Sequence, residues 1–304
     1  MTRAAADVAV VVVAHNSAAD LPDCLASVRA EGAAELVVVD NDSADDSAAV
    51  AAAHGARVVV NAENEGFAAA VNAGVAATAA PVVFLLNPDA VLHSGALEAV
   101  AGRLASDPGV GAVGPRVEHR DGTLQASCRS FPSIAVGAAH GFLGLFWSDN
   151  PVSRRYTMAD WDHTTARDVD WVSGCAVAIS RDAFTSVDGF DPAYFMYVED
   201  VDFCWRLHRH GWRVVYDPAA VVTHAIGTSS GLAPFNLVVE HHRSMLRFER
   251  VRRGGRRGLT WPLIVVGVWA RAAVALARRA IAGARPAAHH RIEATVAAPE
   301  EKAG

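Results

Sequence analysis

The first third of the chain alternates short apolar runs with alanine-rich stretches of helical spacing. The apolar runs are rich in valine and carry few polar residues, which is typical of strands buried on both faces. This alternation predicts an α/β fold with a mostly parallel central sheet covered by helices on both sides. The expected strands are residues 8–14, 35–40, 56–60 and 81–86, and the expected helices are residues 20–31, 44–54 and 66–79.

Polar side chains follow each of these four expected strands. Ligands of parallel sheets bind beyond the carboxyl ends of the strands, so these residues should share one rim of the sheet. They are His15 and Asn16, Asp40 and Asn41, residues 61–64, and residues 87–89.

The pattern becomes less regular after about residue 110. A strand and a turn at Asp121–Gly122 are expected first, and strand character returns at residues 169–180. Residues 200–210 have helical spacing, and Gly211 is placed to end that helix. Two further strands are expected at residues 212–218 and 220–225.

Composition places the chain among cytoplasmic globular proteins. Its 304 residues, 52% of them hydrophobic, can bury the core of a large domain. The four cysteines show no C-x-x-C spacing, which argues against a zinc cluster or a disulfide framework. Because Asp7 interrupts the first apolar run and His15 ends it, we interpret that run as a buried strand and not as a signal peptide.

Positive charge gathers near the C-terminus, although the net charge of the chain is −6. Residues 241–279 hold ten arginines and a single glutamate. The apolar segment 259–270 among them is shorter than the roughly 20 residues that span a bilayer. We expect residues 235–283 to form a basic helical arm that either lies on an anionic membrane or packs on the body or a second subunit. Residues 284–304 are expected to be disordered, and no nucleic-acid partner is expected.

Individual polar motifs each allow a structural and a functional interpretation. Ser43 or Asp42 can cap the following helix, whereas Asp40 ends a buried strand and needs a donor such as a base or a ribose hydroxyl. Asn64 and Gly66 precede a helix and fit either a turn or a phosphate contact at the helix N-terminus.

Two further motifs could hold a metal ion. Asp89 ends an Asn-Pro-Asp corner, which is a common turn and also a source of a hard oxygen ligand for Mg²⁺ or Mn²⁺. His224 ends a strand, where histidine is more often structural, yet imidazole suits Mn²⁺.

Several of these motifs together resemble a known family. In order and spacing, the chain is similar to family 2 glycosyltransferases of the GT-A fold, and more narrowly to bacterial rhamnosyltransferases that use dTDP-L-rhamnose, including actinobacterial enzymes acting on N-acetylglucosaminyl-diphospho-polyprenol. The resemblance covers roughly residues 8–250. It is carried by VVVAHN, VVVDNDSADDS, NEGFAAAVNAG, FLLNPDAVL, GCAVAISRDAF, VDGFDPAYFMYVEDVDFCWR and AVVTHAIGTSS.

The resemblance implies a division of the chain. Residues 1–234 would form the glycosyltransferase domain, with a Rossmann-like nucleotide-sugar half at 1–109 and an acceptor and catalytic half at 110–234. The implied donor-site residues are His15, Asn16, Asp40, Asn41, Asn64, Gly66, Phe67, Asn72, Asn87 and Asp89. The implied acceptor-site residues are Trp171, Gly174, Cys175 and Glu199.

The resemblance also assigns the chemistry. Asn87 and Asp89 occupy the family's D-x-D position, with Asp89 and His224 implied as ligands of Mg²⁺ or Mn²⁺, although Asn87 stands where the commonest pattern has an aspartate. Asp200 matches the catalytic base, and Glu199 would orient it or bind acceptor.

Elementary electrostatics separates the three acidic residues of the "EDVD" stretch. Asp202 lies four residues before Arg206 on a helix and is expected to form a salt bridge. Asp200 lies at the start of the helix, where the dipole favours an ionised carboxylate, the form that a base requires.

The sequence therefore predicts an inverting, metal-dependent transfer of a sugar, foremost L-rhamnose from dTDP-L-rhamnose, to a lipid-linked glycan on the inner face of the plasma membrane. Transfer of another sugar, such as galactofuranose from UDP, remains an alternative, as does a sugar-nucleotide or glycan-binding module without catalysis. Whether the chain forms a homo-oligomer is left open.

Overall fold

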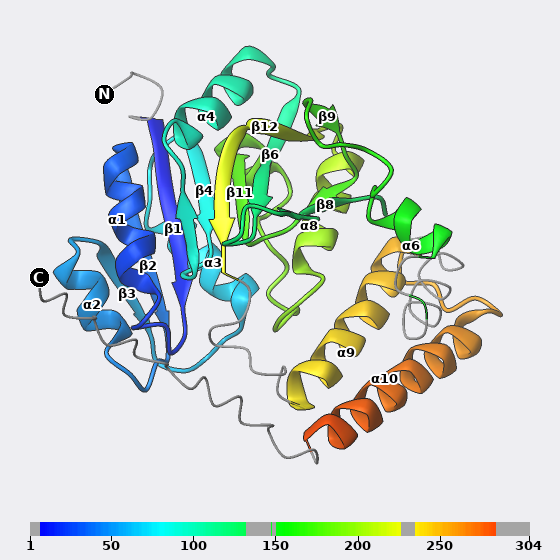
Figure 1. Cartoon of the computed structure of the whole chain (residues 1–304). Helices are drawn as coiled ribbons and strands as arrows, with labels where there is room; N and C mark the ends of the chain where they lie inside the picture. The colour runs from blue at the N-terminus through cyan, green and yellow to red at the C-terminus, as the bar shows by residue number, and fades with distance from the viewer. Residues whose placement is uncertain (1–6, 132–146, 148–149, 226–234, 284–304) are drawn as a thin grey trace, which may run out of the picture.

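The computed structural model describes residues 7–131, 147, 150–225 and 235–283 of the chain (Figure 1). Its first half is the expected alternation of strands and helices. The elements are β1 (Val8–Ala14), α1 (Leu21–Glu31), β2 (Glu35–Asn41), α2 (Ser47–Ala53), β3 (Arg57–Asn61), α3 (Phe67–Ala76) and β4 (Val82–Leu86). Their strands pair in parallel, as predicted, and their order across the sheet is β3-β2-β1-β4.

The second half extends the same sheet with mixed strand directions. Strand β11 (Ala176–Ser180) pairs antiparallel with β4 and with β6 (Val110–Glu118), which in turn runs parallel to β12 (Arg213–His224). The outermost strand, β5 (Ala90–Leu92), pairs antiparallel with the end of β12. The short strands β7 (Leu124–Gln125) and β9 (Arg167–Asp168) join β6 and β12, whereas β8 (Cys128–Arg129) and β10 (Trp171–Val172) form a separate ribbon.

Two stretches differ from the sequence-based expectation. Residues 169–180 form not one strand but β10 and β11, separated at residues 173–175. The two strands expected at residues 212–218 and 220–225 form one continuous strand, β12 (Arg213–His224), whose register shifts between Asp217 and Val221. Pro218 lies in this irregular stretch. Proline has no backbone N–H to donate to a neighbouring strand, so within sheets it is tolerated at bulges such as this one.

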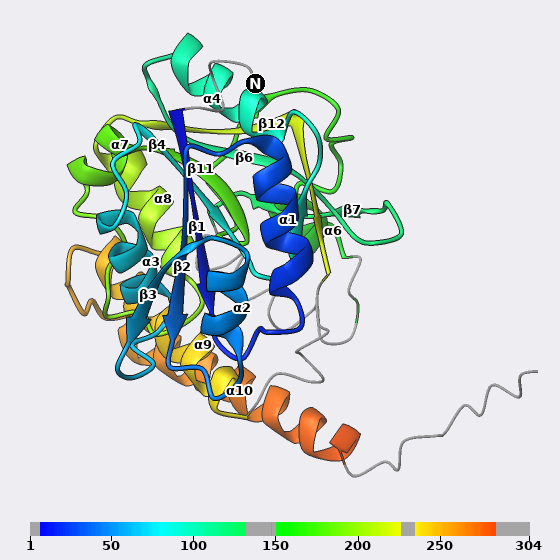
Figure 2. The ribbon, with the colours of Figure 1, turned by 90° about the vertical axis from the view of Figure 1, so that its left-hand side faces the viewer.

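The core lies on both faces of the sheet, because successive strand residues point to opposite sides. Val10 and Val12 of β1 pack with α1 and with α4 (Ala96–Ser106). Val11 packs in the second cluster with residues of α3 and α8 (Glu199–Arg209). Figure 2 shows α3 and α8 on the opposite side of β1 from α1. Gly74 allows α3 to approach closely, since a Cβ there would lie 2.4 Å from Val11 Cγ1.

The remaining helices belong to the second half of the chain. They are α6 (Pro151–Tyr156), α7 (Arg181–Ser186), α9 (Phe235–Arg252) and α10 (Trp261–Gly283). Helices α9 and α10 lie side by side beyond the sheet (Figure 1). Arg247 of α9 pairs with Asp191 at 2.6 Å, and Ser244 Oγ donates to the carbonyl of Met196 at 3.1 Å, so α9 is anchored to the body.

Helix α10 is longer than the apolar segment expected from the sequence, because it continues through Arg271. Residues Trp261–Ala280 are long and apolar enough to cross a bilayer by length and composition, a property that helices packed on protein can share. The expectation that this apolar segment is too short to span a bilayer is therefore wrong. The expected disordered tail, residues 284–304, lies outside the described residues.

Candidate active site

The Asn-Pro-Asp corner and the end of β12 meet at the edge of the sheet. Strand β5 begins directly after the corner, and Ala90 is opposite His224 in the β5–β12 ladder. The backbone N–H of Ala225 donates to the carbonyl of Asp89 at 3.0 Å, which closes the corner. As a result Asp89 Oδ1 lies 3.1 Å from His224 Nε2, and Asn87 Nδ2 lies 3.2 Å from the same nitrogen.

Gln125 orients the imidazole of His224. Its Oε1 lies 3.1 Å from His224 Nδ1, so Nδ1 carries the proton and donates to the amide oxygen. In the neutral ring, Nε2 then presents a lone pair toward a carboxylate oxygen of Asp89. Two lone pairs at 3.1 Å repel each other unless a cation or a proton lies between them. A buried histidine with its second nitrogen fixed in this way is the usual arrangement of a metal-binding imidazole.

This corner fits a divalent ion that is also bound by substrate. No group of three or more His, Cys, Asp or Glu side chains with metal-ligand geometry occurs in the described part of the chain. Asp89 and His224 thus supply two protein ligands, and Mg²⁺ and Mn²⁺ bound to nucleotides commonly complete their shell with phosphate oxygens and water. The side chains are only 14% and 10% exposed, which leaves a narrow access to the ion.

Asp40 presents an unsatisfied oxygen at the end of β2. The residue is 4% exposed, and its Oδ1 has no hydrogen-bond partner within the described structure. Its Oδ2 accepts only a long bond of 3.4 Å from the N–H of Ser43. Since buried acceptors are normally paired, Asp40 is suited to receive a donor from a ligand.

His15 and Asn16 connect β1 to the loop after β2. Asn16 adopts a left-handed conformation with φ 54° and accepts from the N–H of Ala44 at 2.8 Å, while its own N–H donates to Ser43 Oγ at 3.0 Å. His15 Nδ1 donates to the carbonyl of Asn41 at 2.9 Å. The expectation that Ser43 or Asp42 caps the next helix is wrong, because α2 begins only at Ser47 and Ser43 instead bonds to Asn16.

Asn41 and Asn64 organise the rim of the sheet. Asn41 Oδ1 accepts from Asn61 Nδ2 at 2.9 Å, and Asn41 Nδ2 donates to Asn64 Oδ1 at 2.9 Å. Asn64 Oδ1 also accepts from the N–H of Gly66 at 3.0 Å. These bonds hold the loop after β3 against the end of β2.

Gly66 and Phe67 contact the acceptor half of the protein. A Cβ at Gly66, where φ is 87°, would lie 2.4 Å from the carbonyl oxygen of Phe195. That same oxygen accepts from the N–H of Phe67 at 2.8 Å. Phe195 therefore occupies the first N–H of α3 in this conformation. The sequence suggested that Gly66 allows a close contact with phosphate, whereas in the structure it allows a close contact with the backbone of Phe195.

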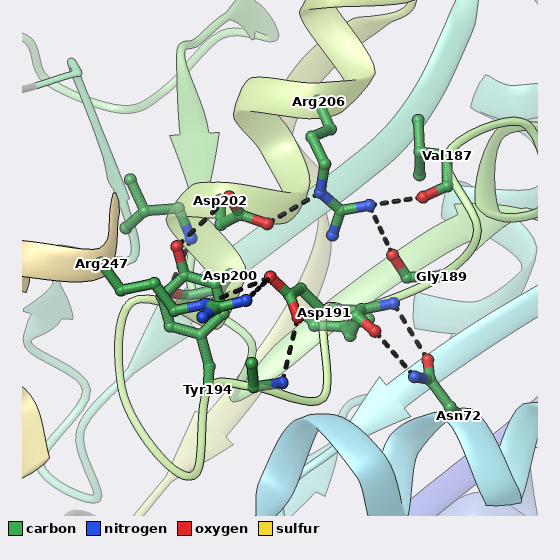
Figure 3. Close-up of polar contacts among 12 residues, drawn as sticks. Asn72, Val187, Gly189, Asp191, Tyr194, Asp200, Asp202, Arg206 and Arg247 are labelled. Carbon is green, nitrogen blue, oxygen red and sulfur yellow. Dashed lines mark hydrogen bonds and ion pairs between the residues drawn. The ribbon is translucent and has the colours of Figure 1, made fainter. Parts of the chain in front are cut away.

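Asn72 has a structural role that the sequence did not reveal. Its Nδ2 donates to the carbonyl of Phe190 at 2.7 Å, and its Oδ1 accepts from the N–H of Phe190 at 2.9 Å (Figure 3). Both ends of the amide are occupied within the protein, and the assignment of Asn72 to nucleotide binding stays a prediction. The residue fastens α3 to the loop that precedes α8.

Glu199 and Asp200 open helix α8 after two strained residues. Tyr197 and Val198 both have φ 69°, which is unusual for any side chain and especially for the β-branched Val198. Each such residue costs about 1–3 kcal/mol and typically persists at functional sites. Asp200 Oδ2 accepts from the N–H of Gly174 at 3.0 Å and its Oδ1 from the N–H of Val201 at 2.8 Å.

Burial dominates the ionisation of this pair. It raises the pKa of Glu199, and the charge of Asp200 raises it further. Burial also raises the pKa of Asp200, but the N–H groups of Gly174 and Val201 and the charge of Arg129 oppose that rise. We therefore place the negative charge on Asp200 and the proton on Glu199. The expectation that the helix dipole controls Asp200 is corrected, because desolvation has the larger effect.

Asp202 forms the expected salt bridge. Its Oδ2 lies 2.7 Å from Arg206 Nε, and its Oδ1 accepts from the hydroxyl of Tyr194 at 3.3 Å (Figure 3). Arg206 also donates to the carbonyl of Gly189 at 2.7 Å. Tyr194 is fully buried, so of the aromatic residues near Asp200 this one belongs to the core.

The other acceptor-side candidates differ in their access to the site. Cys175 is buried, and burial raises the pKa of its thiol to about 11, which makes it an inert core residue. Trp171 is 6% exposed and donates from Nε1 to the carbonyl of Ser130 at 3.2 Å. Gly174 contacts Asp200 directly through its N–H.

Sequence reasoning missed Gln125 and Arg129. Both belong to the stretch after the Asp121–Gly122 turn, and their spacing of four residues in an extended segment is a weak signal for a shared face. The guanidinium of Arg129 lies 5.3 Å from the Trp171 ring and 5.6 Å from the Tyr156 ring.

Comparison with solved structures defines the class. A mannosyltransferase from Pyrobaculum calidifontis in complex with GDP-mannose and Mn²⁺ aligns with a TM-score of 0.57 over 92% of this chain and 76% of its own, at 20% identity. Glucosyl-3-phosphoglycerate synthase from Mycobacterium tuberculosis in complex with Mn²⁺, UDP-glucose and phosphoglyceric acid gives 0.56 over 83% and 81%, at 19% identity. The fold is that of the GT-A glycosyltransferases.

Sequence comparison defines the family. The model of "glycosyltransferase like family 2" matches residues 5–245. The N-acetylglucosaminyl-diphospho-decaprenol L-rhamnosyltransferase of Mycobacterium tuberculosis is 34% identical over 271 residues, which are 84% of this chain and 88% of that protein. The chain belongs to glycosyltransferase family 2, and the protein is a glycosyltransferase.

Proposed function

We propose that the protein is an inverting, metal-dependent rhamnosyltransferase that moves L-rhamnose from dTDP-L-rhamnose to N-acetylglucosaminyl-diphospho-polyprenol in cell-wall or surface polysaccharide synthesis. The identity of the sugar and of the acceptor is supported by the likeness to the mycobacterial rhamnosyltransferase, which extends over most of both chains.

One structural observation carries the catalytic part of this proposal. The consecutive residues Gly174 and Cys175 connect the metal corner to the catalytic carboxylate. The N–H of Gly174 donates to Asp200 at 3.0 Å, and the carbonyl of Cys175 accepts from the N–H of Asn87 at 2.8 Å. A candidate base and a candidate site for the departing diphosphate are thus built on one short segment, as a transfer between them requires.

The donor would bind along the rim formed by β1, β2 and β4. Asp40 Oδ1 is placed to accept from a pyrimidine N3–H or a ribose hydroxyl, since it has no other partner among the described residues. Asp89 and His224 would hold the Mg²⁺ or Mn²⁺ ion, which when bound supplies charge that stabilises the leaving nucleoside diphosphate. The Mn²⁺ complexes of two proteins of the same fold support a divalent ion but do not distinguish manganese from magnesium.

Asp200 would act as the general base. Its carboxylate takes the proton of the acceptor hydroxyl while that oxygen attacks the anomeric carbon from the face opposite the diphosphate, so the configuration inverts. Gly174 and Val201 hold the carboxylate in position through their N–H groups. Glu199, protonated and with Oε2 unpartnered within the described structure, can donate a hydrogen bond to the acceptor sugar.

The C-terminal arm would hold the enzyme on the cytoplasmic face of the membrane. Leu259, Leu263 and Val266 are 100%, 74% and 67% exposed. Beside them, a cavity of about 510 Å³ at the turn between α9 and α10 is lined by Arg247, Arg250 and Arg257 together with apolar residues and Trp261. Exposed apolar side chains next to arginines are the composition of interfacial helices that bind anionic lipids.

A donor panel tests this function. Purified protein with Mn²⁺ would be given a synthetic N-acetylglucosaminyl-diphospholipid and, separately, dTDP-L-rhamnose, UDP-galactofuranose or UDP-glucose. We expect product only with dTDP-L-rhamnose. Product with UDP-galactofuranose alone would reassign the donor, and nucleotide-sugar binding without transfer from any donor would favour a binding module.

A further inference from the structure

Arg271 of α10 is a partly buried cation whose nearest polar partner is an imidazole. Its Nη1 lies 2.9 Å from His242 Nε2, and its Nε has no hydrogen-bond partner within the described structure. His242 is 2% exposed and donates from Nδ1 to the carbonyl of Val238 at 2.6 Å, so its Nε2 accepts from Arg271. None of the ion pairs among the described residues includes Arg271, and burial lowers its pKa, which shows that the charge is held at a cost.

Arg129 of β8 is a second partly buried cation, and its polar partner is the side chain of Tyr156. It is opposite Trp171 in the β8–β10 ladder, and its guanidinium packs between the rings of Trp171 and Tyr156. Its Nε is buried without a hydrogen-bond partner, and no carboxylate among the described residues pairs with it at salt-bridge distance. Arg129 lies near the catalytic carboxylates, since its charge lowers the pKa of Asp200.

A chain of side-chain contacts links Arg271 to the segment before α8, because the ring of His242, its partner, lies 5.5 Å from that of His241. Burial lowers the pKa of His241 to about 4, with smaller contributions from Arg271, His242 and Arg129, so this histidine is neutral at physiological pH. The ring of His241 meets that of Tyr197, two residues before Glu199, edge to face at 5.4 Å. The two arginines thus place positive charge near this histidine and near the start of α8.

Both arginines have a buried Nε without a hydrogen-bond partner in the described structure, and guanidinium matches the geometry of a phosphate group. We propose that Arg129 and Arg271 bind the diphosphate of a sugar-diphospholipid acceptor and so set the distance between that diphosphate and the hydroxyl presented to Asp200. This inference rests on the proposed function. In this arrangement the lipid chain would run from Arg271 along α10 toward the exposed apolar residues Leu263 and Val266.

The alternative is structural. Arg129 would then only favour the ionised form of Asp200, and Arg271 would only fasten α10 to α9. Removing either arginine would in that case lower transfer to every acceptor by the same factor. A role in diphosphate binding, by contrast, affects only acceptors that carry a diphosphate.

The test combines protein variants with acceptor variants. Full-length Arg129→Gln, Arg271→Gln and Arg271→Lys would be assayed with an N-acetylglucosaminyl-diphospholipid and with an alkyl N-acetylglucosaminide that lacks the diphosphate. We expect the wild type to prefer the diphosphate acceptor in kcat/KM. Each glutamine variant should lose at least about tenfold of that preference, the equivalent of roughly 1.4 kcal/mol in binding. Arg243→Gln, on the same hairpin but ion-paired with Glu240, is the matched control and should keep the preference.

A second readout does not depend on turnover. Binding of citronellyl diphosphate, measured by calorimetry, should weaken at least about tenfold in the glutamine variants and less in Arg271→Lys. Thermal unfolding identifies any variant that fails to fold. Because the two arginines come from different elements, the proposal can still be tested with one variant if the other does not fold. Equal losses for both acceptors, or unchanged citronellyl diphosphate affinity in folded variants, would overturn the proposal. A wild type that binds citronellyl diphosphate through these arginines but transfers no sugar would contradict the proposed function alone.

Discussion

Asp89 Oδ1 lies 3.1 Å from His224 Nε2, although the two residues come from opposite halves of the chain. The antiparallel pairing of β5 with β12 brings them together, because Ala90 and His224 are register partners. A carboxylate facing the lone pair of an imidazole is stable when a cation lies between them. This relationship is the structural basis for expecting a divalent ion at the corner.

Removing the carboxylate should therefore affect only metal-dependent binding. In Asp89→Ala, affinity for the nucleotide sugar should fall in the presence of Mn²⁺ and equal that of the wild type when the metal is chelated. His224→Ala should behave similarly but more mildly, since water and phosphate oxygens can replace an imidazole. Calorimetry with and without chelator measures both. An equal loss under both conditions would make Asp89 structural.

Gln125 should tune the metal site without touching the ion. Gln125→Leu removes the acceptor that fixes the Nδ1–H form of His224, and such changes typically lower metal affinity by about 10- to 100-fold. Gln125→Glu keeps an acceptor at this position and serves as the control. If Gln125→Leu binds Mn²⁺ as tightly as the wild type in a titration with nucleotide present, Gln125 has no such role.

Glu199 should make stability fall as the pH rises. Burial raises its pKa in the folded state, so its contribution is fully present below the usual carboxyl pKa and is lost as the pH rises toward the raised value. Glu199→Gln removes this loss and should unfold at a higher temperature than the wild type at neutral pH. The difference should shrink toward pH 4. Thermal unfolding of both proteins from pH 4 to neutral pH measures this difference. A lower unfolding temperature for Glu199→Gln at neutral pH would contradict the conclusion that Glu199 is protonated in the folded protein.

Membrane attachment should depend on both charge and apolar contact. We expect full-length protein to sediment with anionic vesicles at low salt and to be partly released at high salt, since salt screens exposed charges. The double variant Leu263→Gln and Val266→Gln should bind vesicles more weakly. Val60→Gln, which replaces a 65% exposed valine on β3, is the control. Full-length protein that ignores anionic vesicles while transferring sugar normally would show that the arm only packs on protein.

Local patterns predicted much of the fold. The strands β1 to β4 and their helices begin and end within three residues of the expected positions, because valine runs and alanine-rich helices encode them directly. The salt bridge between Asp202 and Arg206 followed from helical spacing alone. These features depend on neighbours in sequence.

Features that depend on distant contacts could not be predicted in the same way. The amide of Asn72 is used by Phe190, and the close approach at Gly66 is made by Phe195, both on a loop far along the chain. The raised pKa of Asp200 likewise reflects burial by several elements, which sequence position does not show. The contribution of both Arg129 and Arg271 to the lowered pKa of His241 arises only when β8 and α10 are placed in space.

The role of Asp200 is the central claim, and the rate of sugar transfer by Asp200→Asn tests it most directly. The amide has the size of the carboxylate but cannot take a proton, so transfer should fall by about 10²-fold or more, the contribution typical of a general base. Donor affinity, measured in parallel, should remain close to that of the wild type because Asp200 contacts Gly174 and Val201 and lies outside the metal corner. In the wild type the rate should rise with pH through the raised pKa of Asp200. Transfer by Asp200→Asn at nearly the wild-type rate would contradict the account.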